Sequence, residues 1–109
     1  MMNLCPTPHA VQRAKERTGW CQRTLNRMLE RIFYDGLTSE DCSRRLRVYL
    51  ADIMYALPSR FARIYGEHVF IFARENDPNE VALITILLLP ADLRPVAHRD
   101  RELRSLASA

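Results

Sequence analysis

Several common sources of enzyme chemistry are missing from this sequence. It contains no glycine-rich phosphate loop, no CxxC pair, no Ser-His-Asp order and no paired-carboxylate signature. Without these features a large metabolic enzyme and cofactor-dependent chemistry are both disfavoured, so we expect no cofactor.

Cysteines and long apolar stretches are also scarce. The three cysteines, Cys5, Cys21 and Cys42, are odd in number and lack the spacing of a disulfide framework, as expected in a reducing cytoplasm. The longest apolar runs are too short to span a membrane, and the opening residues, MMNLCPTPHA, lack the apolar core of a signal peptide. We therefore expect a cytoplasmic protein that does not contact a membrane.

The potential metal ligands do not form a set. Cys5 and His9 are close in sequence, whereas His68 and His98 each stand alone. A tetrahedral zinc site needs four ligands, and no second close pair supplies the other two. The sequence therefore predicts no metal site.

Lysine is nearly absent, since Lys15 is the only one of the 16 basic residues that is not arginine. Arginine can bind phosphates and carboxylates with two parallel hydrogen bonds. The formal net charge is +3, but residues 1–64 carry 11 basic and 6 acidic side chains, whereas residues 65–109 carry 5 and 7. This basic N-terminal part is compatible with a polyanionic partner such as nucleic acid.

Three helices are expected in the first half of the chain. The first has Thr7 as N-cap and Pro8 in its first turn, and it ends at Gly19. The second has apolar residues at helical spacing, namely Leu25, Met28, Leu29, Ile32 and Phe33. The third ends before Pro58 and has the apolar stripe Leu46, Tyr49, Leu50, Ile53, Met54 and Leu57.

Three strands are expected after residue 58. The stretches FARIYG, HVFIFAR and VALITILLLP alternate in polarity or are rich in β-branched and aromatic residues, and short turns separate them. The tail from about residue 95 is expected to be weakly ordered, with at most a short helix over Arg99–Leu106. Residues 1–109 are thus predicted to form a single α+β domain, with three N-terminal helices followed by a three-stranded antiparallel meander.

The packing of the last predicted strand also has to be explained. Val81–Leu89 is apolar on both alternating faces, so both faces need to be covered. We expect the third helix to pack on one face, together with Leu25, Leu29 and Ile32 of the second. The other face or the free edge is left to the tail helix, a second copy or another partner, and a homodimer through Val81–Leu89 is the simplest solution.

His9, Arg13 and Arg17 are spaced four residues apart, which places them on one face of the first helix. An imidazole can move a proton on or off the 2′-hydroxyl or the leaving oxygen of RNA, and guanidinium groups can stabilise the charge that grows on phosphorus. Thr85, the one polar residue within the last apolar strand, could add a hydroxyl. The alternative is an exposed histidine in a first helical turn and a threonine satisfied locally.

Arg23, Arg27 and Arg31 repeat the same spacing on the second helix and are candidates for binding nucleic acid or a partner. Acidic residues stand at ion-pair spacing from the arginines of both helices: Glu16, Glu30 and Asp35. For the row on the second helix, an ordinary solvated surface is therefore the favoured interpretation.

The stretch PHAVQRAKERTG, followed by a meander that ends in ALITILLLP, resembles small phage and mobile-element proteins that begin with an H-A-x-x-R-x-x-x-R helix. It is also similar in outline to ribonuclease toxins of the barnase, EndoU, colicin and RelE type. The resemblance covers about a third of the chain. It implies helices before an antiparallel sheet, RNA as substrate, and an active site of His9, Arg13, Arg17 and Thr85. No second acid–base residue is evident, and His68 is a candidate without a matching motif.

Two other functions remain open. A non-enzymatic phage or mobile-element protein, such as an anti-CRISPR inhibitor, would use the arginine-rich helices to block a host nucleoprotein complex. A winged helix-turn-helix regulator would read DNA with its third helix, but the long apolar stripe of that helix favours a position in the core.

Overall fold

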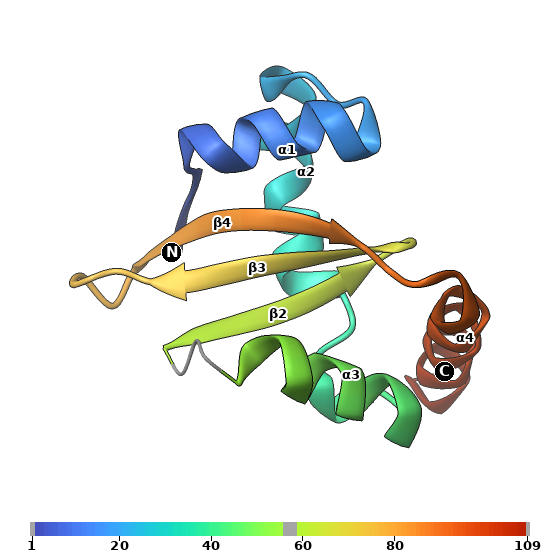
Figure 1. The fold of residues 1–109 in the computed structure, drawn as a ribbon. Coiled ribbons are helices and arrows are strands. Elements are labelled where there is room, and N and C mark those ends of the chain that lie inside the picture. The colour runs from blue at the N-terminus through green and yellow to red at the C-terminus, as the bar shows by residue number, and fades with distance from the viewer. Residues whose placement is uncertain (1, 56–58, 109) are drawn as a thin grey trace.

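The computed structural model describes residues 2–55 and 59–108. Over these residues the chain forms an α+β fold of four α-helices and a four-stranded mixed sheet (Figure 1). Short 3-10 helices precede α3 and α4. The elements in chain order are β1 (Asn3–Pro6), α1 (Pro8–Thr18), α2 (Gln22–Asp35), α3 (Arg44–Met54), β2 (Arg60–Tyr65), β3 (His68–Arg74), β4 (Glu80–Leu88) and α4 (Arg94–Ser108).

The predicted arrangement, three N-terminal helices followed by a three-stranded antiparallel meander, is wrong because a strand precedes the first helix. β1 pairs in parallel with β4, from Asn3 opposite Glu80 to Pro6 opposite Leu83, and the strand order is β1-β4-β3-β2. The pairs β2–β3 and β3–β4 are antiparallel, as the meander requires. β1 has only four residues, NLCP, and is too short to display an alternating pattern in the sequence.

β4 is consequently an inner strand of the sheet and not its edge. β1 covers its second side over Glu80–Leu83, and α1 also packs against β4 (Figure 1). The edge that led to the prediction of a homodimer through Val81–Leu89 is therefore occupied by the chain itself as far as Leu83, and the homodimer stays a prediction. β1 and β2 form the two edges of the sheet instead.

Helices cover both faces of the sheet, which gives the domain two cores. Successive residues of a strand point to opposite faces, so Phe70 and Phe72 of β3 belong to one core whereas Val69 and Ile71 belong to the other. The first core contains the buried residues of α1 and α2, namely Ala10, Ala14, Leu25, Leu29, Ile32 and Phe33. The second core contains buried residues of α3 and α4, namely Leu46, Leu50 and Ala97.

α3 thus lies on the opposite face of the sheet from α2, and the predicted packing between the apolar stripes of these helices is wrong. Leu46 and Leu50 are buried, as the periodicity predicts. Three further residues of the stripe are partly buried against the second core: Tyr49, Ile53 and Met54. Leu57 and Pro58, the expected end of this helix, lie outside the described residues.

The C-terminal helix is longer than the expected short helix over Arg99–Leu106. α4 begins at Arg94, and Ala97 anchors it in the second core. Asp100, which is 4% exposed, accepts hydrogen bonds from the backbone N–H and the hydroxyl of Ser43 at 2.8 and 2.9 Å. Asp100 therefore satisfies a backbone donor at the start of α3 and joins the two helices of the second core.

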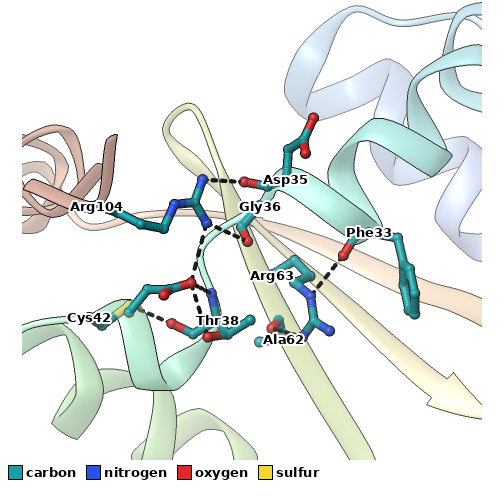
Figure 2. A network of polar contacts seen from close by, with 9 residues as sticks. Phe33, Asp35, Gly36, Thr38, Cys42, Ala62, Arg63 and Arg104 are labelled. Atoms are coloured by element: carbon teal, nitrogen blue, oxygen red, sulfur yellow. Dashed lines mark hydrogen bonds and ion pairs between the residues drawn. The ribbon is translucent and has the colours of Figure 1, made fainter. Parts of the chain in front are cut away.

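The chain passes from one face of the sheet to the other at Gly36 and Leu37. Leu37 pairs with Ile64 of the edge strand β2. Gly36 has no space for a side chain, because a Cβ there would lie 2.5 Å from the carbonyl oxygen of Ile32. Arg104 of α4 binds this crossing (Figure 2), where it donates hydrogen bonds to the carbonyls of Asp35 and Gly36 and to the carboxylate of Asp41.

Leu50→Ala should lower the free energy of unfolding by about 2–5 kcal/mol, because Leu50 is 2% exposed in the second core. Val48→Ala is the matched control on the same helix, since Val48 is 57% exposed, and it should change this free energy by less than about 0.5 kcal/mol. Urea unfolding monitored by circular dichroism measures both values. Equal losses for the two variants would contradict the placement of α3.

Candidate functional site

The candidate site is centred on an irregularity in β4. Ile71 pairs with Thr85 while its neighbour Phe72 pairs with Leu83, so Ile84 is an extra residue in β4, as in a β-bulge. A bulge changes the direction of nearby side chains relative to a regular strand, and bulges are common beside functional sites.

Thr7 attaches the start of α1 to this bulge. Its backbone N–H donates to the carbonyl of Leu83 at 3.0 Å, and its hydroxyl donates to the carbonyl of Ile84 at 3.3 Å. The same hydroxyl oxygen accepts a hydrogen bond from the backbone N–H of Ala10 at 3.1 Å and thereby caps α1. Thr7 therefore positions the first turn of α1, and with it His9, beside the bulged part of β4.

His9 and Thr85 meet at this junction although 76 residues separate them in sequence. The distance from His9 Nε2 to Thr85 Oγ1 is 3.4 Å. His9 is exposed and Thr85 is half-buried, so the imidazole is accessible to a ligand from solvent. The fold thus brings together the two predicted site residues that come from opposite ends of the chain.

Arg13 and Arg17 follow His9 on α1. Arg13 Nη1 lies 2.6 Å from a carboxylate oxygen of Glu16, and Gln12 donates to the other carboxylate oxygen at 3.0 Å. These hydrogen bonds, the one from Arg13 first, hold the pKa of Glu16 below its ordinary value. Arg13 is thus engaged with an acid, whereas Arg17 makes no ion pair within the part of the chain that the structure describes.

The other two histidines lie away from His9. His68 Nε2 is 3.0 Å from the backbone carbonyl oxygen of Arg17, which is about 12 Å further along α1 than His9 at a rise of about 1.5 Å per residue. His98 is on α4, where its Nε2 lies 3.5 Å from the carboxylate of Glu67. The described residues therefore supply a single imidazole to the site, and His68 does not join His9 as a second acid–base group.

Arg23, Arg27 and Arg31 form an exposed row on α2, away from the buried side of this helix. The expected ion pairs with Glu30 and Asp35 are absent over residues 2–55 and 59–108. The row therefore presents three arginines to solvent without direct ion pairs, although Glu30 and Asp35 on the same helix reduce its net charge.

A metal site among the described residues and a nucleophilic role for Cys42 have little structural support. Among the described residues, no three His, Cys, Asp or Glu side chains gather as ligands for a metal ion. Burial raises the pKa of the Cys42 thiol to about 12, so this thiol stays protonated at neutral pH and is not a nucleophile. The described part of the chain also contains no helix that is long and apolar enough to cross a membrane.

The role of Thr7 in the site is only partly predictable from the sequence. The sequence identifies Thr7 as a helix cap, but it does not indicate that the same hydroxyl also reaches Ile84. That contact requires the parallel pairing of β1 with β4, which no local pattern predicts. Glu16, in contrast, forms the ion pair with Arg13 that its spacing predicts.

Comparison with protein-family models, with curated proteins and with solved structures gives no significant match. The resemblance to phage proteins and ribonuclease toxins therefore stays a hypothesis. Any functional conclusion has to rest on the geometry of the site itself.

Thr7→Val should remove both hydrogen bonds of the hydroxyl and lower the free energy of unfolding by about 1–2 kcal/mol, the usual contribution of a helix N-cap. Thr7→Ser keeps the hydroxyl and should stay within about 0.5 kcal/mol of the wild type. Urea unfolding compares the free energies, and nuclear Overhauser contacts between the His9 ring and the Thr85 methyl report the geometry. If Thr7→Val retains these contacts in full, the positioning role of Thr7 is wrong.

Proposed function

We propose that this protein is a metal-independent ribonuclease in which His9 transfers a proton and Thr85 assists it. The observation that carries the proposal is the 3.4 Å contact between His9 Nε2 and Thr85 Oγ1 beside the bulge in β4. An exposed imidazole held next to a hydroxyl, with arginines on the following helical turns, has the parts needed for acid–base cleavage of a phosphodiester.

In the proposed reaction the 2′-oxygen of the substrate attacks the adjacent phosphorus atom. In the tautomer whose Nε2–H donates to Thr85 Oγ1, His9 accepts the proton of the 2′-hydroxyl at Nδ1. Solvent donates a proton to the 5′-oxygen as the bond from phosphorus to this oxygen breaks. The products are a 2′,3′-cyclic phosphate and a 5′-hydroxyl. The hydroxyl of Thr85 orients the imidazole through the contact at Nε2. The guanidinium group of Arg13 stabilises the negative charge on the phosphoryl oxygens, and Arg17, about two turns further along α1 than His9, binds a neighbouring phosphate.

The arginine row on α2 supports RNA as the substrate in this proposal. Arg23, Arg27 and Arg31 are exposed and without ion-pair partners among the described residues, so they can bind successive phosphates of a polyanion. The proposal includes cellular RNA as the substrate, the cytoplasm as the location, and a role as the toxin of a phage or mobile element.

The same row also supports a second candidate, a non-enzymatic inhibitor that blocks a host nucleoprotein complex. Such a protein needs the positive surface but not the contact between His9 and Thr85. A third helix that reads DNA is disfavoured, because Leu46 and Leu50 bury one side of α3 in the second core. Cleavage and binding experiments separate the two remaining candidates.

His9→Gln should reduce the rate of RNA cleavage by about 10²–10⁴-fold, the usual contribution of general acid–base catalysis. His98→Gln is the matched control, because His98 is an exposed histidine on α4, and it should keep the activity of the wild type. Cleavage should persist in EDTA and should leave 2′,3′-cyclic phosphate ends, which mass spectrometry identifies. A wild-type protein that leaves varied RNAs uncut, ribosome-bound messages included, excludes the ribonuclease and favours the inhibitor.

Glu16→Gln should strengthen RNA binding, because it removes a negative charge from the exposed side of α1 and releases Arg13 from an ion pair. Glu102→Gln on α4 removes the same charge far from α1 and is the control. Fluorescence anisotropy with a short single-stranded RNA should give a several-fold lower Kd for Glu16→Gln alone. Identical shifts for the two variants would mean that Arg13 is not a phosphate ligand.

A further inference from the structure

A second group of arginines surrounds an aromatic side chain on the edge strand β2. The guanidinium carbons of Arg63 and Arg74 each lie 5.1 Å from the centroid of the Phe61 ring. Phe61 stacks on Phe72 of β3, with ring centroids 5.6 Å apart, so the ring that both guanidinium groups approach is held in place by the sheet. Arg63 also lies 5.3 Å from the ring of Phe33, at the end of α2.

The positive charge of this group is only partly offset by the chain, since Asp41 acts on Arg63 from beyond ion-pair distance. Within the described residues neither Arg63 nor Arg74 has a carboxylate at ion-pair distance. Arg63 donates from Nε to the carbonyl of Phe33 at 3.0 Å and from Nη1 to the carbonyl of Ala62 at 3.1 Å (Figure 2), and its Nη2 makes no hydrogen bond to described residues. Burial first, and the neighbouring charge of Arg74 second, lower the pKa of Arg63. Bound negative charge between the two side chains would relieve this repulsion.

An exposed aromatic ring adjoins the same cluster. Tyr34 is 58% exposed at the end of α2, and its ring packs edge-to-face on Phe33 with centroids 5.0 Å apart. Phe33 therefore contacts both Tyr34 and Arg63. An accessible ring near guanidinium groups without carboxylate partners is the combination that binds single-stranded nucleic acid, in which bases stack and phosphates accept hydrogen bonds.

Tyr34 also continues the arginine row of α2. Residues three or four apart share one face of a helix, and Arg23, Arg27, Arg31 and Tyr34 follow this spacing. α2 crosses the sheet from α1 toward β2 (Figure 1). The exposed side of α2 thus carries three arginines and Tyr34 between α1 and the cluster on β2, with Glu30 as an acidic residue on the same face.

We propose that single-stranded RNA binds a second site on β2 and the end of α2, with a backbone phosphate between Arg63 and Arg74 and a base stacked on Tyr34. The site is separate from His9, because β3 lies between β4 and β2 in the sheet. The identity of the ligand as RNA rests on the proposed ribonuclease function. An extended acidic peptide is the less favoured ligand, because the side chain of Arg63 already binds the Ala62 carbonyl on the edge strand.

The test measures binding of a fluorescent 12-nucleotide single-stranded RNA to the full chain carrying His9→Gln, at several salt concentrations. Tyr34→Ala should weaken binding by about 5- to 100-fold, as loss of a stacked base does. Arg74→Ala should weaken binding and reduce the slope of log K against log salt by about 1. Arg101→Ala is the matched control, because Arg101 is an exposed arginine that also lies on an aromatic ring, 5.3 Å from the centroid of Tyr65, and it should bind like the parent.

A second readout keeps the test independent of any loss of folding. RNA that contains 4-thiouridine should crosslink to Tyr34, and peptide mapping by mass spectrometry locates the crosslink. If Arg74→Ala and Tyr34→Ala bind like Arg101→Ala, or if a poly-glutamate peptide displaces the RNA and binds more tightly, the second site for RNA is wrong. If wild-type protein does not cleave RNA but binding still depends on Tyr34 and Arg74, the ribonuclease fails and the second site stands.

Discussion

The parallel pairing of β1 with β4 is the constraint on which the fold and the candidate site both depend. Four residues, Asn3 to Pro6, occupy the side of β4 that would otherwise be the edge of the sheet. The chain then leaves the sheet at Thr7, whose N–H and hydroxyl bind the carbonyls of Leu83 and Ile84. Because the same hydroxyl caps α1, the strand pairing, the helix start and the position of His9 are coupled through one side chain.

Helices cover both faces of the sheet because the chain crosses once from one face to the other. α1 and α2 pack on one face, and α3 and α4 pack on the other, so the chain has to change sides after α2. It does so at Gly36, where a Cβ would collide with the carbonyl of Ile32. Arg104 ties α4 to this crossing through the carbonyls there. The chain thereby brings helices to both faces of the sheet.

The arginines differ in whether they have an acidic partner. Acidic partners engage Arg13 on α1, Arg45 on α3 and Arg104 on α4. In contrast, the row on α2 and the pair around Phe61 have no carboxylate partners among the described residues. Arginines on α1, α3 and α4 also lack ion pairs within this part of the chain, so the absence of a carboxylate does not by itself distinguish one side of the protein. What distinguishes the end of α2 and β2 is that arginines there lie beside several aromatic side chains, and the proposed RNA site depends on this combination.

Local patterns in the sequence determine most of the elements. The cap at Thr7, the apolar stripes of α2 and α3, and the three later strands can be predicted because each depends on residues close in the chain. Local spacing also predicts that His9 and Arg13 share a helix and that Arg13 pairs with Glu16. Only the tertiary structure decides that β1 joins β4, that α2 and α3 lie on opposite faces, and that a bulge brings Thr85 to His9. These features depend on contacts between residues far apart in sequence, and the periodicity of one element does not specify which distant element it packs against.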